Sequence, residues 1–405
     1  MIELVIKVTR NWLRSIGLLT ILFVVSGCLE REVLLPEIEI ERSVLIYMAA
    51  NNNLSAHSFD NIEALKRGYL PSKGNIVVYH HAPGTPPRLF RLVKNKTTKV
   101  IEEELIEQYD EGERSTDPVV LTKTLLRVQE LFPSDEYGLI LWSHATGWKP
   151  ATLPFSYSAA LFAAPLYLKK ENVPLTKSFG TYNADRGMEL NELAEAIPFH
   201  LSFILFDACL MGSVEVVYAL REKTDYIIAS PTEILGSGFP YESMMEPIFR
   251  SNADLSAVCA AFYTFYSQYP LTDYRSGSIS LYGTQKLPEL AATLNAIFDA
   301  HRTDLTHFSP YDVQHFANTH FYYDLDDFVY QLAPGDEYDL FKKALDNVVL
   351  YTNSTEKIFT KITSDAFIPI LRYGGVSTYI PIESQTLLKA AYKETEWNRS
   401  VHLIE

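Results

Sequence analysis

Cysteine, basic charge and long apolar runs are all scarce in this sequence. Only three cysteines occur among 405 residues, at positions 28, 209 and 259. A protein held together by disulfides would carry more, so a disulfide framework is excluded. Lys and Arg number 35 against 50 Asp and Glu, which gives a net charge of −15, and no basic run stands out. Nucleic-acid binding needs a basic face that neutralises phosphates, so we expect no nucleic-acid partner.

One apolar run near the N-terminus, Ile16–Val25, is too short to cross a bilayer comfortably. Basic side chains precede it, as in a signal peptide, and Val25-Ser26-Gly27-Cys28 follows it. Small residues directly before a cysteine resemble a bacterial lipobox, in which the leader is removed and the cysteine is acylated. The resemblance implies a leader over residues 1–27 and lipidation of Cys28. An ordinary signal peptide, or a short anchor with an incidental cysteine, is the alternative.

Lipidation would decide where the protein resides. Two or three acyl chains on Cys28 would hold it stably on a membrane. We therefore expect an exported protein anchored to the bacterial cell envelope, on the outer membrane or the cell surface. Whether it faces the periplasm or the exterior stays open. Residues 28–42 are charged and lack a sustained period, and we predict a tether there.

Continuous apolar runs alternate with helical patterns through the first half of the chain. Such runs are typical of strands buried on both faces, and the alternation indicates a mostly parallel sheet with right-handed crossovers. We predict an α/β/α sandwich over residues 43–250, with an irregular segment at 149–187 of the kind that is usually functional or mobile. The predicted strands are 43–50, 75–80, 89–93, 97–101, 137–142, 201–206 and 226–230, and the predicted helices are 55–69, 117–132, 189–197 and 212–223.

Helical patterns dominate after residue 250. We predict a C-terminal, mainly helical extension over residues 251–405, packed against the sandwich. Its predicted helices are 254–268, 286–303, 324–332 and 337–350, and its predicted strands are 277–283 and two weaker ones near 357–362 and 375–380.

Two predicted strands carry reactive side chains at their carboxyl ends. His144 follows the strand at 137–142, and Cys209 follows the strand at 201–206. Open α/β sheets bind ligands at this edge, where adjacent parallel strands would hold the imidazole and the thiol side by side. A neighbouring imidazole activates a thiol that is otherwise mostly protonated at neutral pH. N–H groups of the helix predicted from Gly212 would further favour the thiolate.

Position alone leaves a structural role open for His144 and Cys209. If the pair is catalytic, the backbone N–H groups of Cys209 and Ala145 would form an oxyanion hole. Cys259 has a different setting, because it lies within an apolar helical run and is predicted to be a buried core thiol.

Two motifs favour a catalytic role for His144 and Cys209, because they resemble those of a known family. Leu139-Ile-Leu-Trp-Ser-His144-Ala-Thr-Gly-Trp148 resembles the His motif of the clostripain family of caspase-like cysteine peptidases, and Phe206-Asp-Ala-Cys209-Leu-Met-Gly-Ser-Val-Glu215 resembles its Cys motif. Residues 44–54 and 109–118 are similar to other family segments, so the likeness covers roughly residues 43–245. It implies a caspase-like fold, with Cys209 as nucleophile and His144 as its proton-transfer partner.

The resemblance also implies a specificity pocket. Asp207 matches an acidic residue that lines the S1 pocket of members cleaving after Arg or Lys; an Asp that only bonds backbone at the strand end is the alternative. Two positions depart from the family pattern. Ala145 stands where a Gly usually follows the His, and Ser237 stands where a second S1 acid is often found. The substrate-binding set is thus Asp207 with Ser237, and a preference for basic P1 residues stays open.

We therefore expect a cysteine endopeptidase that acts on protein or peptide substrates as a monomer. The alternative is an inactive caspase-like surface lipoprotein that binds peptide or glycan. Some family members cleave themselves between the two motifs, and the segment 149–187 offers Lys149, Lys169, Lys170, Lys177 and Arg186 as sites. No metal-site motif is present, and no cofactor is identified; calcium is suggested by the family resemblance alone.

Overall fold

The computed structural model describes residues 42–70, 74–150, 187–362 and 365–405. The predicted leader, Cys28, nearly all of the tether and most of the segment 149–187 lie outside these ranges. The chain from residue 40 to residue 405 forms one compact unit. None of the described helices combines the length and apolar character that crossing a membrane requires.

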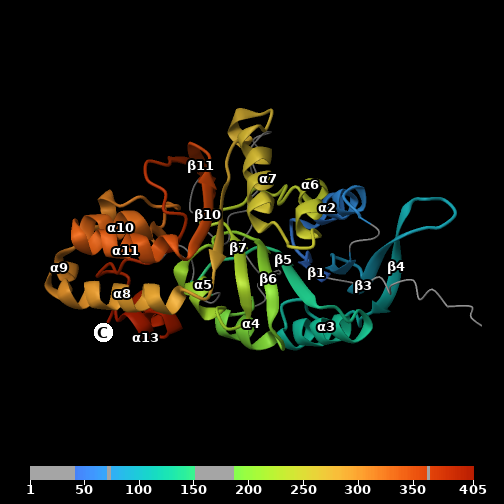
Figure 1. Cartoon of the computed structure of the whole chain (residues 1–405), viewed down its shortest axis with the longest axis horizontal. Coiled ribbons are helices and arrows are strands. Elements are labelled where there is room, and N and C mark those ends of the chain that lie inside the picture. Colours follow the sequence, from blue (N-terminus) through green and yellow to red (C-terminus); the bar gives the residue numbers. More distant parts are fainter. Residues whose placement is uncertain (1–41, 71–73, 151–186, 363–364) are drawn as a thin grey trace, which may run out of the picture. The chain divides into compact units, whose positions relative to one another are not determined.

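A nine-stranded mixed sheet organises this unit, as Figure 1 shows. The five central strands run parallel and the strands at both edges run antiparallel, so the predicted α/β class with a parallel central sheet is confirmed. In sheet order the strands are β10 (Val349–Ser354), β8 (Ser278–Gly283), β7 (Thr224–Ala229), β6 (Leu201–Asp207), β5 (Glu136–Trp142), β1 (Arg42–Ala49), β2 (Asn75–His81), β3 (Arg88–Lys94) and β4 (Ile101–Gln108).

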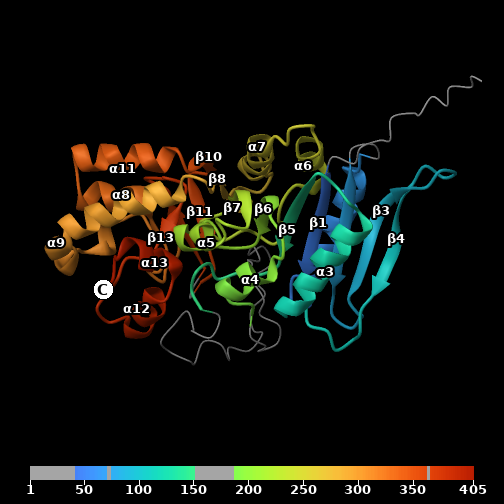
Figure 2. The same cartoon turned by 60° about the horizontal axis from the view of Figure 1, so that its bottom comes forward.

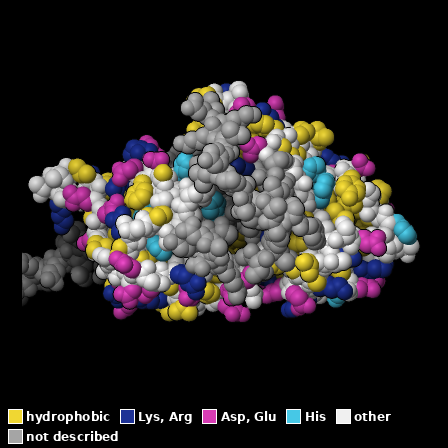
Figure 3. All heavy atoms as spheres, turned by 180° about the vertical axis from the view of Figure 1, so that it is seen from behind, with side chains coloured by type: hydrophobic (Ala, Val, Ile, Leu, Met, Phe, Trp, Pro, Cys, Tyr) yellow, Lys and Arg dark blue, Asp and Glu magenta, His cyan; other side chains and the backbone are white. Residues whose placement is uncertain are grey.

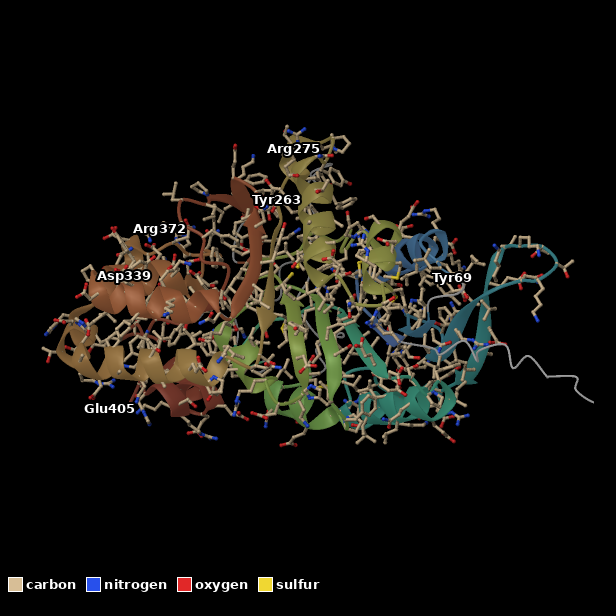
Figure 4. All side chains as sticks on the ribbon, viewed as in Figure 1. Tyr69, Tyr263, Arg275, Asp339, Arg372 and Glu405 are labelled. Atoms are coloured by element: carbon tan, nitrogen blue, oxygen red, sulfur yellow. The ribbon has the colours of Figure 1, made fainter. Side chains whose placement is uncertain are left out.

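Helices cover both faces of the sheet, and side chains fill the space between the layers (Figure 4). In Figure 1 one layer lies below the sheet and the other above it. Because helices cover both faces of the parallel strands, β1 and β2 are buried along their whole length, and the middle of each strand is apolar. The lower layer comprises α3 (Pro118–Leu131), α4 (Leu190–Ala196) and α5 (Val214–Ala219); the upper one comprises α2 (Ser55–Arg67), α6 (Tyr241–Ile248) and α7 (Leu255–Ser267).

The region after residue 270 is more mixed than predicted. Its strands β8 and β10 belong to the main sheet, and two small sheets pair β11 with β12 and β13 with β9. The predicted boundary at residue 250 stays a prediction. The remaining helices are α8 (Leu287–Ala300), α9 (Arg302–His307), α10 (Leu325–Leu332), α11 (Asp336–Asp346), α12 (Thr386–Lys393) and α13 (Glu396–Val401), with short 3-10 turns at Thr272–Tyr274 and Pro310–Asp312; the small-sheet strands are β9 (Tyr323–Asp324), β11 (Lys357–Thr360), β12 (Ala366–Pro369) and β13 (Ser377–Thr378).

Three sequence predictions of elements were wrong in extent. The hairpin partner of β3 is β4 rather than 97–101, because the Asn95 side chain accepts bonds from Thr97 and Thr98 and folds that stretch into a turn. The helix predicted to reach residue 350 ends at Asp346, and the chain continues as β10. The helix predicted from Gly212 begins at Val214, with Ser213 as its cap.

Candidate active site

His144 and Cys209 follow neighbouring parallel strands. Trp142 of β5 pairs with Asp207 of β6, so each reactive residue stands two positions beyond the same rung of the sheet. The N–H of Ser143 donates to the carbonyl of Asp207 at 3.4 Å and continues the pairing toward the site. Figure 2 shows β5 beside β1 at the centre of the sheet. The structure thus brings the two loops together at one edge of the sheet.

The His144 side chain is nearly buried and bonds to Asn53. Its Nε2 lies 2.6 Å from the Asn53 amide oxygen, with 6 % of the residue exposed. As the amide is oriented, this oxygen only accepts, so the proton of a neutral imidazole is assigned to Nε2 and the basic lone pair to Nδ1. Sequence reasoning missed Asn53, because the run Asn51–Asn53 signalled only the end of a strand.

The turn that presents Asn53 is tied to the strand that delivers His144. The Asn52 amide donates to the Ala49 carbonyl at 3.0 Å and accepts from the Leu54 N–H at 2.9 Å. The Ser143 hydroxyl donates to the same Ala49 carbonyl at 2.8 Å. The Asn53 amide is therefore anchored to the same strand ends as the imidazole that it contacts.

Cys209 has no exposed surface in this structure. Its Sγ accepts from the Ile234 N–H at 3.3 Å and donates to the Ile234 carbonyl at 3.6 Å. A backbone N–H that points at sulfur favours the thiolate over the thiol. The next residue is fixed as well, since the Leu210 N–H donates to the Thr232 carbonyl at 2.9 Å. The Cys209 thiol is held in place but closed to solvent.

The expected support from a helix N-terminus was wrong in its details. The helix α5 begins five residues after Cys209, and its first turn is capped by the Ser213 hydroxyl, which accepts from the Val216 N–H. The Gly212 N–H is used by the Ser230 carbonyl at 2.8 Å. The N–H that faces the sulfur and favours an anion there comes from Ile234.

The His and Cys loops approach each other at Gly147. This residue has φ +60°, and a Cβ built on it would lie 2.6 Å from the Leu210 carbonyl oxygen. Leu210 itself has φ +64°, which is unusual for a branched residue. Ala145 is not among the described residues with positive φ, so its Cβ brings no left-handed strain. The oxyanion-hole role of Ala145 and Cys209 stays a prediction.

Asp207 binds the loop 237–241, which begins with Ser237. The buried Asp207 carboxylate accepts from the Phe239 N–H at 3.3 Å and from the Tyr241 hydroxyl at 3.0 Å. Burial, together with the Asp207 charge, raises the pKa of Tyr241 far above its usual value. Ser237 is half-buried, and its carbonyl accepts from the Asn61 amide at 3.1 Å. The carboxylate therefore holds the loop 237–241 whatever else it binds.

The second described cysteine is remote from this chemistry. Cys259 lies fully buried on α7, and burial raises the pKa of its thiol well above the usual range. Within the described ranges, no group of three or more His, Cys, Asp or Glu side chains is arranged to hold a metal ion. On the face seen in Figure 3, acidic and basic side chains are interspersed.

A thiol and an imidazole at the ends of adjacent parallel strands, in an α/β/α sandwich, define a cysteine peptidase of the caspase-like class. Comparison with known families identifies the peptidase family to which the chain belongs. The model of the clostripain family, C11 peptidases, matches residues 46–386, so the chain belongs to that family.

Among curated proteins, the clostripain of Hathewaya histolytica is 24% identical over 229 residues, which is 51% of this chain and 42% of that protein. The match thus spans less than half of the length of that relative. Solved structures are similar over nearly the whole chain. An inactive zymogen C11 protease from Parabacteroides distasonis has 34% identity and a TM-score of 0.75, covering 89% of this chain and 97% of its own. A secreted C11 cysteine protease from Bacteroides thetaiotaomicron, in complex with an irreversible peptide inhibitor, has 27% identity and a TM-score of 0.73, covering 89% and 98%.

Proposed function

We propose that this chain is a cysteine endopeptidase with Cys209 as nucleophile and His144 as proton-transfer group. The observation that carries the proposal is the pairing of Trp142 with Asp207, which gives the two side chains equivalent places on neighbouring strands. His144 takes the proton of the Cys209 thiol, the resulting thiolate attacks the scissile carbonyl, and the backbone N–H groups of Cys209 and Ala145 stabilise the oxyanion. His144 then protonates the leaving amine, and water hydrolyses the thioester.

Asn53 acts as a positioning residue in this scheme. Its amide oxygen lies 2.6 Å from Nε2 of His144, so it fixes the imidazole orientation and the tautomer in which Nδ1 handles the proton. Positioning of this kind lowers the barrier because the acid–base group does not have to reorient during each step.

A basic P1 side chain is the substrate that Asp207 fits best. A buried carboxylate is costly unless it pairs with a cation or with hydrogen-bond donors, and a basic P1 side chain would add a charged partner to the two donors of the loop 237–241. Ser237 contributes a hydroxyl rather than a second charge, so we expect Arg or Lys to be preferred but other P1 residues to be accepted.

The form described here corresponds to a closed precursor in this proposal. The thiol has no exposed surface, and the most identical of the structural relatives named above is described as an inactive zymogen. Self-cleavage within residues 149–187 would then open the site. Export agrees with the relatives described as secreted, and lipidation of Cys28 would keep the enzyme on the cell envelope.

A peptide scan with thiol labelling tests the function directly. The soluble protein, starting after Cys28, is incubated with fluorogenic peptides that vary at P1 and, in parallel, with an iodoacetamide probe. Once the site has opened, we expect turnover that Cys209→Ala abolishes, labelling at Cys209 but not at Cys259 in the core, and a loss of basic preference in Asp207→Asn. An inactive peptide-binding protein is the rival, favoured by the sealed thiol. Slow, equal labelling of both thiols without turnover, even after prolonged incubation, would establish the rival.

A further inference from the structure

A separate cavity of about 590 Å³ lies beside the loop that follows His144. Trp148 and Pro150 form one wall, α4 and α5 form others, and the junction of α12 and α13 closes the rest. The volume is that of a small-molecule site rather than of a single ion. None of the residues proposed above for catalysis or for the S1 pocket lines it.

The lining of this cavity is strongly acidic. Two basic side chains also line it, and both are engaged: Arg399 pairs with Glu394 at 2.7 Å, and the Lys223 ammonium donates to the Ile197 carbonyl at 3.1 Å. Glu222 and Glu396 also pair with Arg221, at 3.5 Å and 2.6 Å. Six carboxylates against three cations give a formal charge of −3, so the cavity attracts cations. The acidic residues are Glu189, Glu195, Glu215, Glu222, Glu394 and Glu396.

Glu215 supplies an independent sign of a missing partner. The residue is 1% exposed, and its Oε1 accepts from the Thr378 hydroxyl at 2.8 Å, the Tyr379 N–H at 3.1 Å and the Tyr392 hydroxyl at 3.1 Å. Its other oxygen, Oε2, has no hydrogen-bond partner among the described residues. Buried polar atoms are nearly always paired, so an unpaired carboxyl oxygen in the wall of an acidic cavity points to a ligand.

The chemistry of the wall selects the class of ligand. The described residues contain no group of three or more side chains arranged to hold a metal ion, which argues against a divalent cation. The carboxylates are instead spread over a large volume, and Trp148 adds an aromatic surface that suits a delocalised or alkylated cation. We propose that this cavity binds a small organic cation, an alkylammonium or guanidinium group, either free or as the side chain of a basic peptide.

The cavity is lined by residues that closely follow His144 and Cys209 in the sequence. Trp148 stands four residues after His144, and Glu215 stands six residues after Cys209. The Trp148 ring packs against Tyr379 at 5.0 Å and against Tyr392 at 5.1 Å, the same two residues that bond Glu215. A ligand in this cavity would therefore contact the residues that support the loops of His144 and Cys209, but not the residues proposed for catalysis or for the S1 pocket.

Calorimetry on the inactive Cys209→Ala protein tests this proposal without reference to activity. The probes are spermidine and the capped tripeptide acetyl-Gly-Arg-Gly-amide, which distinguish a free cation from a peptide side chain. We expect one-to-one binding of at least one probe, weakened at least tenfold by Glu195→Lys, which reverses an exposed charge at the rim. The matched control is Glu289→Lys, an exposed helical glutamate that does not line the cavity.

Further variants make the outcome decisive. Glu215→Gln, checked for folding by its melting temperature, should weaken binding at least tenfold, whereas Asp207→Asn should leave it unchanged. The absence of binding by both probes would overturn the proposal. So would equal affinities of the Glu195→Lys and Glu289→Lys proteins, or loss of binding in Asp207→Asn, which would place the ligand in the S1 pocket instead. Since the protein used has no nucleophile, none of these outcomes depends on the peptidase assignment.

Discussion

Replacing Gly147 with Ala should disable the enzyme while leaving it folded. The substitution places a Cβ 2.6 Å from the carbonyl oxygen of Leu210, the residue after the nucleophile. Ordinary van der Waals contact begins at 3.4 Å, so the His loop and the Cys loop must separate by about 0.8 Å. A misplacement of about 1 Å between reacting groups can cost about 100-fold in rate. We expect kcat/KM of Gly147→Ala to fall by about that factor.

The cost in stability should be modest by comparison. Gly147 has φ +60°, and an L-residue in the left-handed region costs about 1–2 kcal/mol. Gly84, in the turn between β2 and β3, has φ +73°, and no described atom lies within 4 Å of a Cβ built there. Gly84→Ala therefore carries the same conformational cost without the collision, and it is the matched control.

The assay compares both variants with the unmodified enzyme. Thermal unfolding should show similar decreases in melting temperature, about 2–4 °C per kcal/mol or less for a chain of this size. Steady-state cleavage of a fluorogenic peptide should show the full loss in Gly147→Ala and activity within about twofold of normal in Gly84→Ala. If Gly147→Ala cleaves as fast as Gly84→Ala, the close approach of the two loops does not control catalysis.

Two further predictions concern histidine environments. Asn53→Ala should lower kcat roughly 10- to 100-fold with little change in KM, because it removes the bond that orients His144. Asn53→Asp should move the acidic limb of the pH–kcat/KM profile to higher pH. A purely structural role for Asn53 would not produce that movement. Burial lowers the pKa of His80 to about 4, so the unfolded chain binds its proton first and stability falls as pH drops from 6.5 toward 4. The loss in the free energy of unfolding at low pH is roughly 3 kcal/mol. Urea unfolding measured from pH 6.5 to pH 4 should show that this free energy declines less steeply with pH in His80→Gln. An equally steep decline in the variant would contradict the role of His80.

The sequence predicted the framework of the site well, because that framework depends on buried parallel strands. Unbroken apolar runs identified β5 and β6, and His144 and Cys209 stand two positions beyond the ends of these strands. The side-by-side placement of these strands followed from the rule for parallel sheets and is confirmed by their register. The fold class could be predicted at this level, whereas the family was predicted from the resemblance of the motifs around His144 and Cys209.

The parts that the sequence did not predict depend on contacts between distant segments. Asn53 becomes a partner of His144 only because the turn after β1 packs against the end of β5. The N–H that faces the Cys209 sulfur comes from Ile234, in a loop with no periodic signal. The predicted helix 337–350 took in Val349 and Leu350, the first two residues of β10, and the pairing of β10 with β8 decides the strand.

The C-terminal region also takes part in holding the site. The Ser377 N–H donates to the Gly212 carbonyl at 3.0 Å, and the Tyr322 hydroxyl donates to the Thr146 carbonyl at 2.6 Å. One of these bonds secures the stretch beyond the thiol, and the other secures the stretch beyond the imidazole. A chain shortened to its first 250 residues would lose both of these hydrogen bonds and two strands of the main sheet, β8 and β10. The smallest unit able to cut peptides must therefore extend well into the last third of the polypeptide.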